Sequence, residues 1–200
     1  MSNQQEARLH SEVQQITDAI QSLTGLRSQW SGNVSILPTD SYAIGRKSFD
    51  CLIQLRTDLL TRNLRWRTLI HEAFHAVSAG YYAQDFFQNV GWEEGVVENL
   101  QRLFRRRILA QCGIILEETL FFEAERNHSF NRYIDALESI RTAFGLREEE
   151  FYLMLIRIPI RERYTSLTRR ALQMGENKSR CLFALSAAQI ILKEGNRGYN

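Results

Sequence analysis

The sequence predicts an α+β fold in which a small antiparallel sheet, at about residues 34–56, packs on a mainly helical body. Three observations predict it. Strand-like alternation is confined to that early segment, helical periodicity precedes and follows it, and 44% of the 200 residues are apolar. A chain of this length buries roughly 70% of its unfolded surface, which is enough for a core. We expect one domain over residues 1–200.

The first expected element is a helix that ends near Gly25, a residue that often terminates helices. Apolar residues recur there at intervals of three and four, which is the spacing of one helical face. These residues are Leu9, Val13, Ile16, Ile20 and Leu23.

The next two apolar segments have the pattern of strands. Val34–Leu37 is a short apolar run that ends at Pro38. In Phe49–Arg56 the odd positions are apolar and most even positions are polar, which is the period of a half-buried strand. Together these segments indicate a small antiparallel sheet of two or three strands.

Helical periodicity returns after Thr57 and continues to about residue 194. A first stripe ends near Gly80, a second helix runs from about Trp92 to Leu109, and further amphipathic helices follow. The first stripe consists of Ile70, Ala73, Phe74 and Val77, and the later helices break near Asn127, Gly145, Pro159 and Gly175. We expect residues 1–110 to form the core of the fold and 111–200 a helical C-terminal subdomain.

The charge composition favours internal ion pairs over a nucleic-acid surface. The net charge is +2, and 22 arginines stand against 3 lysines. Arginine prefers paired and partly buried positions more than lysine does. Arg102, Arg105, Arg106 and Arg107 form a basic cluster, but acidic residues are interspersed along the chain and aromatic residues are few near it. We therefore expect no nucleic-acid partner. An arginine-rich helical nucleic-acid-binding protein is kept only as a third and weaker hypothesis.

The sequence indicates a cytoplasmic protein. Its start lacks a basic cap followed by an apolar stretch, so we expect no secretory signal. No apolar run reaches the length of a spanning helix, so we expect no membrane association. Cys51, Cys112 and Cys181 are far apart and odd in number, which fits free thiols in a reducing compartment.

One motif carries chemistry: His71-Glu72-Ala73-Phe74-His75, which contains two of the four histidines of the chain. Residues four apart lie one turn above each other on a helix, so both imidazoles point into the same space and can bind one zinc ion. Glu72 is rotated by about 100° from His71, which places its carboxylate beside the ion. A carboxylate there can take a proton from an activated water and pass it to a leaving amine.

A catalytic zinc site needs a third protein ligand and an open position. The downstream candidates are Asp85, Glu93, Glu94 and Glu98. Glu94 and Glu98 are four apart and therefore share one helical face. Only one of them need bind the ion, and the other can accept a hydrogen bond from an imidazole and orient it.

The chain resembles the gluzincin metallopeptidases over about residues 34–109. The resembling residues are His71-Glu72-Ala73-Phe74-His75 and, after 18 intervening residues, Glu94 within Trp92-Glu93-Glu94-Gly95. The small size and single sheet are also similar to the compact ImmA/IrrE-like peptidases. The resemblance implies a zincin-like core with one zinc ion on His71, His75 and Glu94, and with Glu72 as the catalytic base. It also implies that Phe49–Arg56 is the sheet edge that pairs with an extended substrate.

The first hypothesis is therefore a zinc-dependent endopeptidase that acts on a protein or peptide. The aminopeptidase segment G-x-M-x-N is absent, so we do not expect an aminopeptidase. The alternative is an inactive zinc-binding scaffold or regulatory module, which a fourth protein ligand would favour. The residues that could polarise the carbonyl are Tyr81, Tyr82, Tyr133, Tyr152, Tyr164 and His128, and none stands out.

Overall fold

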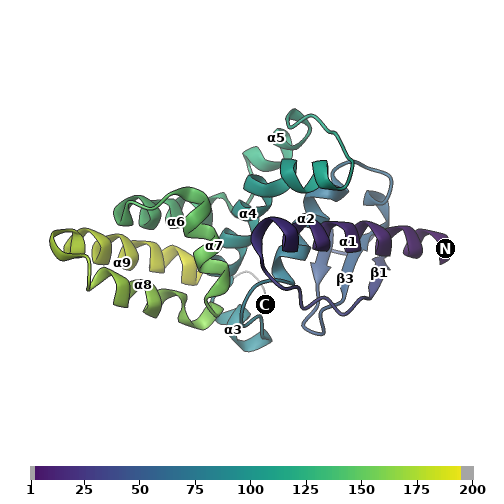
Figure 1. The fold of residues 1–200 in the computed structure, drawn as a ribbon. Coiled ribbons are helices and arrows are strands. Elements are labelled where there is room, and N and C mark those ends of the chain that lie inside the picture. Colours follow the sequence, from purple (N-terminus) through teal and green to yellow (C-terminus); the bar gives the residue numbers. More distant parts are fainter. Residues whose placement is uncertain (1–2, 195–200) are drawn as a thin grey trace. The chain divides into compact units, whose positions relative to one another are not determined.

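The computed structural model describes residues 3–194, which form a mainly helical structure with one small sheet, as the α+β class predicts. The helices are α1 (Asn3–Thr24), α2 (Arg65–His75), α3 (Ala83–Gln88), α4 (Val90–Gln111), α5 (Thr119–Arg126), α6 (Asn131–Phe144), α7 (Glu148–Arg157), α8 (Arg163–Ala171) and α9 (Lys178–Glu194). The strands are β1 (Val34–Leu37), β2 (Gly45–Lys47) and β3 (Ile53–Arg56). Figure 1 shows these elements along the chain.

The described residues group into two compact units, and neither is continuous in sequence. Unit 1 contains the described residues up to Val77 together with Gln101–Arg126. Unit 2 contains Ser78–Leu100 together with the described residues from Asn127 onward. Helix α4 is therefore shared, because it begins in unit 2 and ends in unit 1.

In unit 1, α1 and α2 pack against each other and against the sheet (Figure 1). The apolar residues predicted for the first helix are buried at Leu9, Val13, Ile16 and Ile20. A buried ion pair joins the two helices, since Arg65 Nη2 lies 3.1 Å from Glu12 Oε1. The pair and the apolar face hold α2 beside the sheet.

The sheet is mixed, so the prediction of an antiparallel sheet is wrong. Its strand order is β1-β3-β2, with β1 parallel and β2 antiparallel to β3. The β2–β3 hairpin occupies one edge of β3. β1 pairs with the other edge and runs parallel to β3. The alternation of apolar and polar residues along a strand shows which side chains face the core. It does not show which strands pair with it or in which direction they run.

The expected strand Phe49–Arg56 begins four residues later, at Ile53, and is central, so the prediction that it is the sheet edge is also wrong. Residues before Ile53 form the hairpin loop, in which the Cys51 amide donates to the Ser48 carbonyl over 3.0 Å. Cys51 has a φ of 64°, in the left-handed region that strands do not use. The edge strand on the hairpin side of β3 is β2.

Gly45 lets β2 approach α2. A Cβ atom at this position would lie 2.2 Å from Cγ2 of Thr68, a buried residue of α2. Real Cβ contacts are not that short, so the Thr68 side chain or one of the two elements must shift when a side chain is added.

We expect Gly45→Ala to lower the free energy of unfolding by about 1–3 kcal/mol, because it overpacks the β2–α2 contact. Thr68→Ser removes the methyl group that the new Cβ would meet, so the double variant should lose less than the sum of the two single losses. Urea unfolding of the four proteins measures this coupling. Strictly additive losses would contradict the contact.

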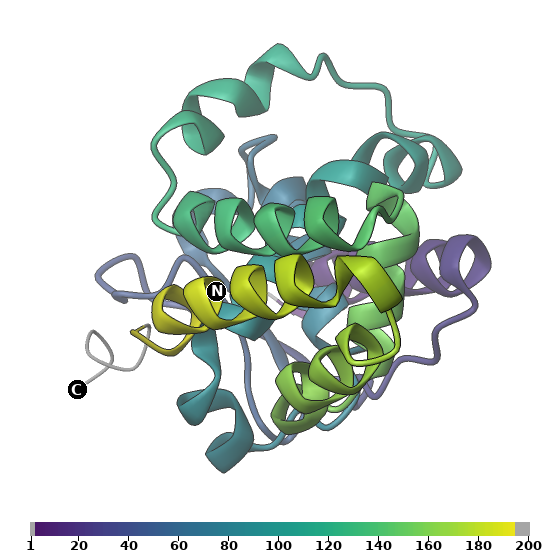
Figure 2. The same cartoon turned by 90° about the vertical axis from the view of Figure 1, so that its left-hand side faces the viewer.

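In unit 2, α6 and α9 lie side by side, and α8 packs on α9 (Figure 2). The first turns of α4 come close to this pair through two glycines. A Cβ on Gly91 would lie 2.6 Å from the Leu192 carbonyl oxygen of α9, and one on Gly95 would lie 2.8 Å from Leu137 Cδ1 of α6. The glycine after Glu94 therefore has a packing reason.

The helix boundaries follow the sequence closely. The four predicted breaks, at Asn127, Gly145, Pro159 and Gly175, all fall between α-helices, with Gly175 at the start of a short 3₁₀ helix (Gly175–Asn177). Helix α2 ends at His75, earlier than the expected end at Gly80, which has a φ of 66°. Between residues 3 and 194, none of the helices combines the length and apolar character that crossing a bilayer requires.

Candidate metal centre

Helix α2 presents His71, Glu72 and His75 in its last turn. All three are buried, with exposed fractions of 8%, 7% and 3%. The apolar stripe of this helix packs beneath them, and Phe74 meets Phe104 of α4 with ring centroids 6.1 Å apart. This packing fixes α2 in unit 1, and the motif residues lie on the polar flank of the helix.

The two imidazoles converge as the motif predicts. Nε2 of His71 and Nε2 of His75 lie 3.1 Å apart, and the rings are nearly perpendicular, at 78°. Two nitrogen ligands at about 2.0–2.1 Å from one tetrahedral zinc ion lie about 3.3 Å apart. The histidine pair therefore fits a single small cation.

The Glu72 carboxylate points toward the outer strand β2. Its Oε2 accepts a hydrogen bond of 2.7 Å from the Lys47 amide. Ile44 and Ser48 make backbone hydrogen bonds to the β3 side, so by alternation the amides of Gly45 and Lys47 face away from β3. One oxygen of Glu72 is thus held by the backbone, beside the last turn of α2.

Glu94, in the first turns of α4, completes a group of three metal-binding side chains. Ligand atoms of His71, His75 and Glu94 all lie within 4.8 Å of one another, and all three residues are buried. Two imidazoles and one carboxylate form a donor set that suits a divalent transition-metal ion. The group can hold a metal ion.

The other acidic candidates are not part of this group of three. Glu98 is fully buried one turn after Glu94, but within residues 3–194 the group of three does not include it. Asp85, on α3, lies 4.0 Å from Arg161. Glu93 is fully buried, and its carboxylate lies 2.8 Å from the Arg163 guanidinium.

The candidates for polarising a carbonyl have ordinary structural environments in unit 2. Tyr81 belongs to a small apolar cluster, and Tyr82 is 68% exposed. The Tyr133 hydroxyl accepts a hydrogen bond of 2.8 Å from Arg132. Burial, with Glu138 nearby, raises the pKa of the Tyr152 phenol. Tyr164 and His128 are half-buried.

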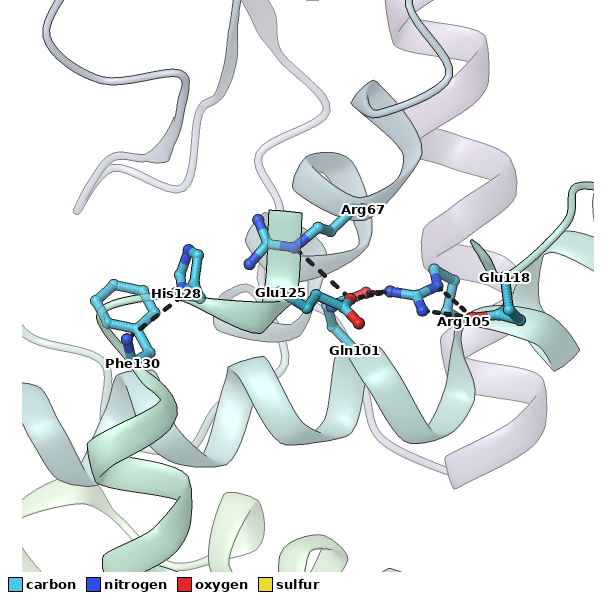
Figure 3. Close-up of polar contacts among 7 residues, drawn as sticks. All are labelled: Arg67, Gln101, Arg105, Glu118, Glu125, His128 and Phe130. Atoms are coloured by element: carbon cyan, nitrogen blue, oxygen red, sulfur yellow. Dashed lines mark hydrogen bonds and ion pairs between the residues drawn. The ribbon is translucent and has the colours of Figure 1, made fainter. Parts of the chain in front are cut away.

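The arginine-rich segment of α4 contributes to an internal ion network in unit 1 (Figure 3). Arg105, 2% exposed, contacts the carboxylates of Glu118 and Glu125, and its Nη1 also donates to Gln101 over 3.0 Å. Burial alone would lower the pKa of this guanidinium, but the two carboxylates raise it above its usual value. Arg67 of α2 lies 3.8 Å from Glu125. The network holds α5 in place. It is an example of the internal ion pairs that the arginine content predicts.

Sequence reasoning missed three groups that bind the acidic residues Glu72 and Glu93. Neither the Lys47 amide nor Arg163 or Ser78 has a local pattern that reveals its partner. The excess of arginine predicts buried pairs in general, but Arg163 lies 70 residues after Glu93 in the sequence.

Comparison with protein-family models, curated proteins and solved structures gives no match to this chain. The candidate site is therefore defined by its own geometry.

Proposed function

We propose that this protein is a zinc-dependent endopeptidase with a zincin-like core, in which His71, His75 and Glu94 bind one zinc ion. The convergence of these three buried side chains, one turn apart on α2 and early on α4, carries the proposal. Three protein ligands leave a fourth position of a tetrahedral site for a water, which is the arrangement of catalytic zinc. When bound, zinc would lower the pKa of a water and polarise the peptide carbonyl.

Glu72 is the general base in this proposal. Because the Lys47 amide donates to Oε2, the carboxylate is held in one orientation, and Oε1 is the atom that would take the proton from the attacking water. The same oxygen would then pass the proton to the leaving amine. A carboxylate fixed by a backbone amide loses little orientation freedom during the reaction.

The outer strand β2 supports an extended peptide as the substrate. Its outward-facing Lys47 amide is bonded to Glu72, so the Gly45 amide would be the donor that pairs with an extended chain by strand addition. In this proposal β2 takes the role that the gluzincin resemblance implies for Phe49–Arg56.

The test is the metal content of the purified protein and four variants. We expect one zinc ion per chain in the wild type, and loss of zinc in His71→Ala, His75→Ala and Glu94→Ala. Glu98→Ala is the matched control, an equally buried glutamate one turn away on the same helix. It should keep one zinc ion per chain, because a residue outside the ligand group can tune the affinity but is not needed to fill the site. Elemental analysis after dialysis against a chelator and zinc reloading gives the stoichiometry.

Two results would contradict the proposed site. One is a wild-type protein that retains no zinc after reloading. The other is a Glu94→Ala variant that binds zinc as tightly as the wild type while Glu98→Ala loses it, which would make Glu98 the third ligand.

A further inference from the structure

In unit 2, a fully buried arginine binds the start of α4. Arg163 of α8 is 0% exposed. Its Nη1 donates to the Trp92 carbonyl over 2.9 Å and lies 2.8 Å from Glu93 Oε2. These two partners are the residues immediately before Glu94, so one side chain holds both the backbone and the side chain of that turn.

The same guanidinium also binds the segment that follows α2. Its Nη2 donates to the Ser78 hydroxyl over 2.9 Å, and this hydroxyl in turn donates to Glu93 Oε2 over 2.9 Å. Its Nε donates to the Leu155 carbonyl over 3.0 Å. Arg163, Glu93 and Ser78 form a closed network, which we call the Arg163 network.

The Arg163 network is costly to bury, so its presence needs an explanation. Removing two charges from water costs several kcal/mol for each ion, and close-packed apolar residues often give equal or greater stability. Burial lowers the pKa of the Arg163 guanidinium, and the Glu93 carboxylate opposes that change. What an apolar pair would not supply is a set of directional bonds that fixes where the first turn of α4 begins.

The network joins the two parts of the chain that lead to the metal-binding side chains. Ser78 follows His75 by three residues, and Trp92 and Glu93 precede Glu94. We propose that Arg163 is the positioning residue of the metal centre, which fixes the first turn of α4 and thereby the direction of the Glu94 carboxylate. This inference rests on the proposed metal site.

Arginine suits this role because its planar guanidinium has five N–H donors in fixed directions. It can serve Trp92, Glu93 and Ser78 at the same time. A lysine ammonium at this depth keeps the charge but cannot reach all three partners with good geometry. Arg163→Lys therefore separates the directional bonds from the charge.

The experiment measures the affinity for Co²⁺, a spectroscopic substitute for zinc, in the full chain. We expect Arg163→Lys to weaken Co²⁺ binding by about 10–100-fold and to change the visible absorption bands of the bound ion. Ser78→Ala, which removes only a hydroxyl, should act in the same direction by a smaller factor. Circular dichroism of each protein records whether it is folded.

The matched control is Arg105→Lys, the same substitution at an equally buried arginine on the second half of α4. The Arg105 guanidinium binds Glu118 and Glu125 and thereby holds α5 in unit 1, so this substitution should change Co²⁺ affinity by less than about twofold. Equal weakening by both arginine variants would overturn the proposal, because it would show a general effect of lost stability.

The outcomes distinguish this inference from the proposed function. A wild-type protein that binds no metal would overturn both. A wild type that binds Co²⁺ while folded Arg163→Lys binds it equally well would overturn the positioning role alone. If Arg163→Lys does not fold, Ser78→Ala decides, and unchanged affinity and spectrum in that variant would overturn the role.

Discussion

Glu72→Gln is expected to leave the fold and zinc binding unchanged and to lower the rate of peptide hydrolysis by about 10²–10⁴-fold. Glutamine has nearly the same shape as glutamate, and its amide oxygen can still accept the Lys47 amide hydrogen bond. What it lacks is a basic oxygen that can take a proton from water. The variant therefore removes one chemical step and keeps the orientation of the side chain.

The measurement is hydrolysis of a peptide library by zinc-loaded wild type and Glu72→Gln, with products identified by mass spectrometry. Glu123→Gln, at an exposed glutamate of α5, is the control for a change of charge. Cleavage by Glu72→Gln at the wild-type rate would remove Glu72 as the base. A zinc-loaded wild type that cleaves nothing in the library would favour the inactive scaffold instead.

Arg163→Met is expected to lower the free energy of unfolding by about 3–5 kcal/mol, because it leaves the Glu93 carboxylate buried without its cation. Glu93→Met should cost a similar amount, since it leaves a buried guanidinium. Both residues are 0% exposed, so neither charge can turn toward water without local unfolding.

The double variant with methionine at both positions provides the test. We expect it to be more stable than the sum of the two single losses predicts, because it removes both charges together. Urea unfolding of the four proteins at neutral pH gives the coupling energy. Single losses below about 1 kcal/mol, the range of exposed ion pairs, would contradict the burial of the Arg163 network.

Local periodicity predicted the helices well. The breaks between the C-terminal helices depend on glycine, proline and asparagine within a few residues of each helix end, so the sequence carries that information locally. The same holds for the histidine pair, because the spacing of four residues on α2 is sufficient to bring the two Nε2 atoms to 3.1 Å. These features depend on short stretches of chain.

The sheet and the choice among the glutamates depend on distant partners, and there the sequence was insufficient. Alternation at Phe49–Arg56 could not reveal that β1 pairs parallel to β3, or that Cys51 turns the chain. Glu93 and Glu94 are adjacent residues of the same type. They differ because Glu93 has a buried guanidinium beside it, which comes from α8.

The division of the chain into interleaved units has a consequence for its biosynthesis. Unit 1 needs Gln101–Arg126, so its core stays incomplete until Arg126 has left the ribosome, although its sheet and first two helices are made much earlier. Until then the apolar faces of α1 and α2 lack the second half of α4, and exposed surface of this kind favours aggregation. Nascent chains can be stalled on the ribosome with Arg126 just inside or just outside the exit tunnel. The two should therefore differ sharply in their resistance to protease.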